Sequence, residues 1–181
     1  LMGRPDVTTR MSTLVNEGLC RLPGDERPSF SVVDFPGSER QRRFLRERLS
    51  QRPLPAAIVF VFDAVVGPLA DLPSSASFLA EVLRLARGVP VCVAVNKCDS
   101  RAAHSVEQAF DVLNAATEAA IADAANAVDS ISIASLQKSA ASVAPTAAAV
   151  APVPREQYLR TSVTAGDVTP LLDFVRSALR G

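Results

Sequence analysis

Residues 89–99, with the sequence VPVCVAVNKCD, decide the fold of this chain. The apolar run over residues 89–95 has the length and composition of a parallel strand that is buried on both faces. The polar residues that follow would lie at the carboxyl end of that strand, where open α/β sheets bind their ligands. The stretch therefore predicts a buried strand that leads directly into a ligand-binding loop.

The tetrapeptide Asn96-Lys97-Cys98-Asp99 predicts recognition of guanine. The two oxygens of Asp99 can accept hydrogen bonds from guanine N1–H and N2–H₂, a pair of donors that adenine does not offer. Asn96 would tie this loop to a phosphate-binding loop, and the aliphatic stem of Lys97 would cover the base. A plain polar turn after a strand is the alternative interpretation of the same four residues.

The chain alternates between strand-like and helix-like segments. Residues 56–62 form a second continuous apolar run, and residues 74–87 and 101–127 carry apolar side chains at helical spacing. This order predicts a doubly wound α/β fold: a three-layer sandwich with a mostly parallel sheet and helices on both faces, as in small GTPases of the P-loop NTPase class. The length of 181 residues suits a single domain over residues 1–181.

A second candidate site follows the predicted strand over residues 30–33. Asp34, at its carboxyl end, would hold a phosphate-bound Mg²⁺ through water, and Gly37 would let a backbone N–H approach a terminal phosphate. An aspartate cap on a Pro-Gly turn is the structural alternative.

Near the end of the chain, a short strand leads into Thr161-Ser162-Val163, whose Val163 N–H is expected to face guanine O6. A helix over residues 167–179, capped by Asp167 or Thr169, closes the chain.

Composition excludes some classes of function. The chain has 19 basic and 19 acidic residues, and this zero net charge argues against direct binding to nucleic acid. The arginines between residues 40 and 52 are either a solvated helix face or a basic patch for a partner or a membrane.

Three cysteines without metal-ligand spacing indicate reduced thiols, with Cys92 in the core, and His104 is expected to face solvent.

Residues 129–154 break the helical pattern. They are poor in charge and low in complexity, and several prolines interrupt their second half. We expect a mobile surface loop between a helix and the last strand.

These motifs together resemble those of one family, the β subunit of the signal recognition particle receptor, an Arf-like GTPase-fold protein of the endoplasmic reticulum membrane. Residues 34–45, DFPGSERQRRFL, are similar to its Asp-Leu-Pro-Gly-His-Glu segment, and residues 57–63, AIVFVFD, are similar to its third strand. Residues 96–99 and 161–163 then follow in the matching order. The resemblance covers nearly the whole chain.

The resemblance implies a GTP-binding subunit that holds the receptor α subunit at the cytosolic face of the endoplasmic reticulum membrane for co-translational targeting. The implied ligands are GTP and Mg²⁺. In this family an amino-terminal strand and a membrane anchor would lie upstream of Leu1. The chain has no apolar stretch near 18 residues, so we expect the membrane span either to lie outside this sequence or never to have been present.

The phosphate-binding residues depart from this family. Aligned on Gly3, the second glycine of a phosphate loop becomes Thr8, its lysine becomes Thr9, and its hydroxyl residue becomes Arg10. A helix over residues 11–20 is expected to follow this loop. Ser38 occupies the position at which GTPases that orient the attacking water carry Gln or His, so we expect slow or absent hydrolysis.

Two other functions are compatible with these residues. One is a nucleotide-free pseudo-GTPase that serves as a structural platform for its partner. The other is an Arf-like or Ras-like switch in vesicle traffic, for which a lipidated or amphipathic amino terminus would be expected.

Overall fold

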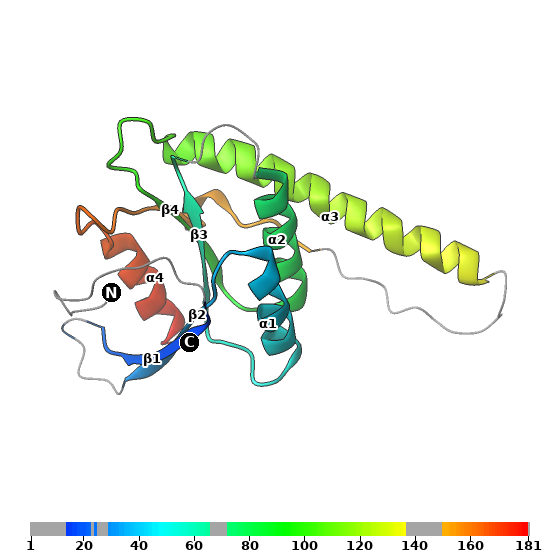
Figure 1. The fold of residues 1–181 in the computed structure, drawn as a ribbon, viewed down its shortest axis with the longest axis horizontal. Coiled ribbons are helices and arrows are strands. Elements are labelled where there is room, and N and C mark those ends of the chain that lie inside the picture. The colour runs from blue at the N-terminus through cyan, green and yellow to red at the C-terminus, as the bar shows by residue number, and fades with distance from the viewer. Residues whose placement is uncertain (1–13, 23, 25–28, 66–71, 137–149, 181) are drawn as a thin grey trace. The chain divides into compact units, whose positions relative to one another are not determined.

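The computed structural model describes residues 14–22, 24, 29–65, 72–136 and 150–180. The chain divides into two compact units, Leu1–Leu54 and Pro55–Gly181, and each is described by itself. Figure 1 shows the elements of both units. The phosphate-loop candidates Gly3, Thr8, Thr9 and Arg10 lie outside the described residues.

The first unit contains a β-hairpin and one helix. Strand β1 (Asn16–Cys20) pairs antiparallel with β2 (Phe30–Asp34), so that Asn16 lies opposite Asp34. The helix expected over residues 11–20 is therefore wrong for Asn16–Cys20, because these residues form their hydrogen bonds with a neighbouring strand. A phosphate loop is followed directly by a helix, and the prediction for residues 3–10 loses that support.

Helix α1 (Glu39–Ser50) follows the Asp-Phe-Pro-Gly turn. Ser38 is its N-cap residue in an extended conformation, and Leu49 is its buried side chain. Most of the remaining side chains of α1 are exposed or half-buried, as a helix with five arginines and two glutamates requires. Five of the arginines between residues 40 and 52 therefore lie on one helix, which has a single buried apolar side chain.

The second unit is built on a parallel sheet with the strand order β3-β4-β5. Its strands are β3 (Ile58–Asp63), β4 (Val91–Asn96) and β5 (Tyr158–Arg160). Residues 91–95 are all buried, which confirms the strand predicted from the apolar run. The register aligns Asp63 with Asn96, so the carboxyl ends of β3 and β4 lie together at one edge of the sheet.

Helices cover both faces of this sheet. Figure 1 shows α2 (Leu72–Leu85) and α3 (Val106–Leu136) on one side and α4 (Thr169–Ala178) on the other. The core lies between the sheet and the helices α2 and α3, and Leu79, Val93, Val95 and Leu113 are completely buried in it. The predicted doubly wound α/β fold is confirmed.

Two boundaries differ from the sequence prediction. Helix α3 begins at Val106 and continues to Leu136, so the expected loop over residues 129–154 is wrong for its first eight residues. The first proline of this segment is Pro145, and helix-forming alanine, isoleucine and leucine residues precede it, so the helix has no reason to stop at residue 127. Residues 137–149 lie outside the described part of the chain.

The expected cap of the last helix is also wrong. Val168 is the N-cap residue of α4 and provides no side-chain hydrogen bond. Asp167 instead pairs with Arg160, at 3.2 Å between Oδ2 and Nη1.

Within the described residues, no helix is both long enough and apolar enough to cross a bilayer.

Candidate functional site

The loop over residues 96–99, which is predicted to recognise a base and is called the base-recognition loop below, begins with a sharp turn at the end of β4. Lys97 has a φ of 64°, a left-handed conformation that side chains other than glycine adopt rarely. The Ser100 N–H closes this turn on the Lys97 carbonyl at 3.0 Å. Backbone strain of this kind is concentrated at functional sites, and here it directs the chain from the buried strand into the loop that carries Asp99.

The Asp99 carboxylate is held by the loop that follows β5. Ser162 Oγ donates to Asp99 Oδ1 at 2.6 Å, and Thr164 Oγ1 donates to Asp99 Oδ2 at 3.1 Å. The hydrogen bond from Ser162, together with a backbone hydrogen bond to Asp99, the Thr164 hydroxyl and the charge of Arg160, lowers the pKa of the Asp99 carboxyl group. The group is therefore ionised at neutral pH and can act only as an acceptor.

The second loop is itself anchored to the sheet and closed on itself. The buried Thr161 donates its backbone N–H to the Val95 carbonyl at 2.9 Å and its hydroxyl to the same oxygen at 3.1 Å. Ser162 and Asp167 exchange two backbone hydrogen bonds of 2.9 Å each. These contacts bring Asn96, Lys97, Asp99 and Ser162, four of the residues predicted from sequence, to one edge of the parallel sheet.

Two polar groups in this region have no partner among the described residues. The Asn96 side-chain oxygen Oδ1 is buried and unpaired. The Val163 N–H group, on an exposed residue, donates no hydrogen bond to the described part of the chain. A buried polar group without a partner, such as Asn96 Oδ1, points to a ligand or a missing neighbour, whereas the exposed Val163 N–H group can bond to water. Both groups are available for the roles predicted for them.

Sequence reasoning assigned no role to Asp63, although the structure places it in the site. Lys97 Nζ lies 2.5 Å from Asp63 Oδ2, and the Val65 N–H donates to Asp63 Oδ1 at 2.9 Å. The side chain of Lys97 is 58% exposed, so the ion pair orients it and contributes little to stability. The sequence contains a signal for this role, because Asp63 comes directly after the apolar run over residues 56–62. Asp99 likewise lies a few residues after the apolar run over residues 89–95.

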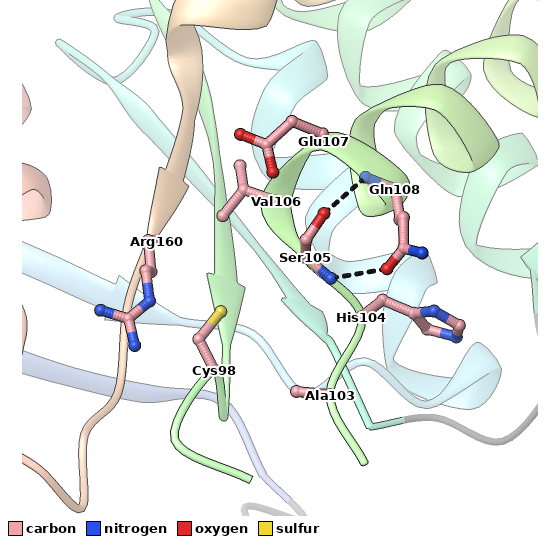
Figure 2. A pocket seen from close by; sticks show the side chains of 8 residues that line it. All are labelled: Cys98, Ala103, His104, Ser105, Val106, Glu107, Gln108 and Arg160. Atoms are coloured by element: carbon pink, nitrogen blue, oxygen red, sulfur yellow. Dashed lines mark hydrogen bonds between the residues drawn. The ribbon is translucent and has the colours of Figure 1, made fainter. Parts of the chain in front are cut away.

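A separate hollow of about 460 Å³ lies beside the base-recognition loop. Figure 2 shows Cys98 and Arg160 on one side of it and the residues that precede and begin α3 on the other. There, Ser105 and Gln108 bond reciprocally: the Ser105 N–H donates to Gln108 Oε1, and the Gln108 N–H donates to Ser105 Oγ. This capping box fixes the start of α3. Asp99 does not line the hollow, so the hollow is distinct from the proposed base site.

Asp34 and Gly37, which are predicted to bind Mg²⁺ and the terminal phosphate, belong to the first compact unit. Asp34 is exposed at the end of β2, and Pro36, in the turn that follows, is buried. A Cβ atom added at Gly37 would meet nothing within 4 Å, which leaves room for a phosphate to approach its backbone. Among the described residues, no group of three or more His, Cys, Asp or Glu side chains could hold a metal ion. A Mg²⁺ ion at Asp34 would thus need phosphate and water as its other ligands.

The comparisons with known proteins agree with the resemblance seen in the sequence. Residues 5–144 match the family described as the signal recognition particle receptor beta subunit. A comparison with curated protein sequences found no match. The fold is similar to a chain in a structure titled "Signal recognition particle receptor SRb-GTP/SRX complex from Chaetomium thermophilum", with a TM-score of 0.53 and 22% sequence identity.

That similarity covers 62% of this chain and 58% of the other, so this chain spans less than two thirds of the length of that relative. At this identity the structural match supports the fold. The family match extends over well more than half of the residues and includes the hairpin, the sheet strands β3 and β4 and the base-recognition loop. The chain therefore belongs to the signal recognition particle receptor beta subunit family.

Proposed function

We propose that this chain is the guanine-nucleotide-binding β subunit of a signal recognition particle receptor. The observation that carries this proposal is the Asp99 carboxylate, ionised and held by Ser162 and Thr164 at the carboxyl edge of a parallel sheet. The related structure from Chaetomium thermophilum is described as a GTP complex, which supports GTP as the nucleotide.

The groups around Asp99 fit a guanine base. The carboxylate would accept from guanine N1–H and N2–H₂, and the unpaired Val163 N–H would donate to guanine O6. The stem of Lys97, oriented by Asp63, would lie over the ring. The unpaired Asn96 Oδ1 would accept a hydrogen bond from the loop that holds the phosphates. Asp34 and Gly37 are the described residues we assign to Mg²⁺ and the terminal phosphate.

We expect the purified chain to bind GTP at least tenfold more tightly than ATP in the presence of Mg²⁺. Adenine presents no pair of donors to Asp99, and leaving the carboxylate unpaired against a base costs about 1–3 kcal/mol. Isothermal titration calorimetry with both nucleotides measures this ratio directly. Equal affinity for the two nucleotides would contradict the assignment of Asp99 to base recognition.

A nucleotide-free platform is the second candidate function. It is favoured by the absence of any Gly-Lys dipeptide from the sequence, since that pair supplies the phosphate-binding lysine of a P-loop. Ser38 at the water-orienting position also implies slow or absent hydrolysis. Undetectable GTP binding by a chain that still binds its protein partner would establish this alternative.

We propose the receptor α subunit as the protein partner and the cytosolic face of the endoplasmic reticulum membrane as the location. The related structure is described as a complex with SRX, which supports a protein partner for members of this fold. By analogy with other switch proteins, we assign the partner surface to the segment that begins at Asp34 and ends at Arg48.

The exposed face of α1 is the most distinctive part of this segment. Arg40 and Arg43 are exposed one turn apart, and the Arg43 guanidinium carbon lies 4.6 Å from the centre of the Phe44 ring. Phe44 is itself 39% exposed. Arginine and aromatic side chains on a free surface are the residue types that most often carry binding energy in protein interfaces.

We expect the double variant Arg40→Glu, Arg43→Glu to weaken binding to the amino-terminal domain of the α subunit by tenfold or more, because charge reversal places repulsive groups at the assigned surface. Binding is measured by titration of the α-subunit domain with GTP present. The matched control is Arg84→Glu together with Arg87→Glu, a reversal of two exposed arginines at the end of α2. Equal loss in both double variants would contradict the assigned surface.

A further inference from the structure

Both oxygens of Asp99 already have a hydroxyl donor from the loop after β5. Ser162 occupies Oδ1 at 2.6 Å, and Thr164 occupies Oδ2 at 3.1 Å. A guanine base would need the same two oxygens, one for N1–H and one for N2–H₂. The question is whether base and hydroxyls can use different lone pairs of the carboxylate.

The distance between the two hydroxyls answers this question. Ser162 Oγ and Thr164 Oγ1 lie only 3.4 Å apart. Donors on the outer lone pairs of a carboxylate, which point away from each other, would be separated by much more than this. The two hydroxyls therefore approach the carboxylate side by side, in the paired arrangement by which two adjacent N–H groups bind it. They lie on the side of the carboxylate from which guanine N1 and N2 would approach.

The two hydroxyls differ in how firmly they are held. Ser162 is 1% exposed, its Oγ accepts the Ala165 N–H at 3.1 Å, and its backbone is paired with Asp167. Thr164 is exposed, and beyond Asp99 its hydroxyl has only the 3.4 Å contact to Ser162. Rotation of the Thr164 side chain into solvent breaks one hydrogen bond, whereas moving Ser162 would open the loop.

We propose that Thr164 sets the affinity of the base site, because its hydroxyl occupies Asp99 Oδ2 until guanine displaces it. This inference rests on the proposed role of Asp99 in guanine binding. A guanine nucleotide must break the hydrogen bond between Thr164 and Asp99 each time it binds, so Thr164 lowers the affinity for guanine nucleotides. Ser162 keeps its hydrogen bond to Asp99 Oδ1 and shares that oxygen with the base.

The test compares Thr164→Val, which keeps the shape and removes the hydroxyl, with Thr164→Ser, which keeps the hydroxyl. Removing a competing hydrogen bond to the carboxylate should tighten GTP binding about fivefold in Thr164→Val and leave Thr164→Ser within twofold of the wild type. Calorimetry measures the affinities. The pKa of the Asp99 carboxyl group, followed by NMR without nucleotide, should rise in Thr164→Val only, because a donor to the charged form is lost.

The outcomes separate this inference from the proposed function. If the wild type binds GTP and Thr164→Val binds it equally or more weakly, Thr164 supports the base site and the inference is overturned alone. An unchanged Asp99 pKa in Thr164→Val overturns it as well, because the contact would then be absent in solution. If no variant binds GTP, the proposed function is overturned, and this inference with it.

Discussion

Replacing Asp99 by asparagine is expected to reverse the purine preference of this chain, with GTP binding weakened about 100-fold and XTP bound in its place. The asparagine side chain keeps one acceptor and replaces the other with an NH₂ donor. Guanine N2–H₂ would then face a donor, whereas the xanthine carbonyl at that position would face a partner of the right kind. The effect on GTP is large because the substitution removes the negative charge of the acceptor and places a donor opposite the guanine N2–H₂ group.

Competition titrations of GTP, ATP and XTP against the wild type and Asp99→Asn measure this reversal. Asp111→Asn is the matched control, because Asp111 is exposed on α3 and lies outside the site. The control should keep the wild-type order of affinities. If Asp99→Asn also keeps that order, Asp99 does not contact the base, and the guanine assignment is wrong.

The second large effect is expected in the core. Leu113 is completely buried and belongs to the core cluster that α3 forms with the parallel sheet. Truncation to alanine removes buried apolar surface and leaves a cavity, which costs about 2–5 kcal/mol of unfolding free energy. A domain of ordinary stability loses a large share of its total at this cost.

Urea unfolding followed by circular dichroism gives the difference in unfolding free energy. Val112→Ala is the matched control, since Val112 is the adjacent residue of the same helix and is 43% exposed. Val112→Ala should lower the unfolding free energy by only about 0.5 kcal/mol, because a half-exposed side chain buries little apolar surface. Equal destabilisation by the two variants would show that α3 does not pack on its Leu113 face.

Much of the second compact unit could be predicted from local sequence patterns. Continuous apolar runs led to β3 and β4, and helical spacing of apolar residues led to α2, because both signals depend only on which faces of an element are buried. The segment over residues 11–20 was predicted as a helix from the expected position of a phosphate loop. Its residues Asn16–Cys20 form a strand instead, since pairing with Phe30–Asp34 is a tertiary contact that local spacing does not encode.

The candidate site shows the same division. Asn96 and Asp99 were recognised by their position after a buried strand, but the partners of these residues lie far away in sequence. Ser162 is 63 residues from Asp99, and Asp63 is 34 residues from Lys97. The loop that contains Ser162 is predicted from its position after a short strand, whereas the hydrogen bond of Ser162 to Asp99 and the contacts of Asp63 and Thr164 are visible only in the structure.

The sequence by itself was enough to predict the parallel strands and the helix α2, and the resemblance of its motifs was enough to predict the family. Recognition of guanine by Asp99 stays a prediction. The strands and the helix follow from the order of apolar and polar residues along the chain. Only the tertiary structure decided that both carboxylate oxygens are already bonded, because that depends on the parallel register of β4 and β5, which aligns Val95 with Arg160 and carries the loop of Ser162 and Thr164 to Asp99.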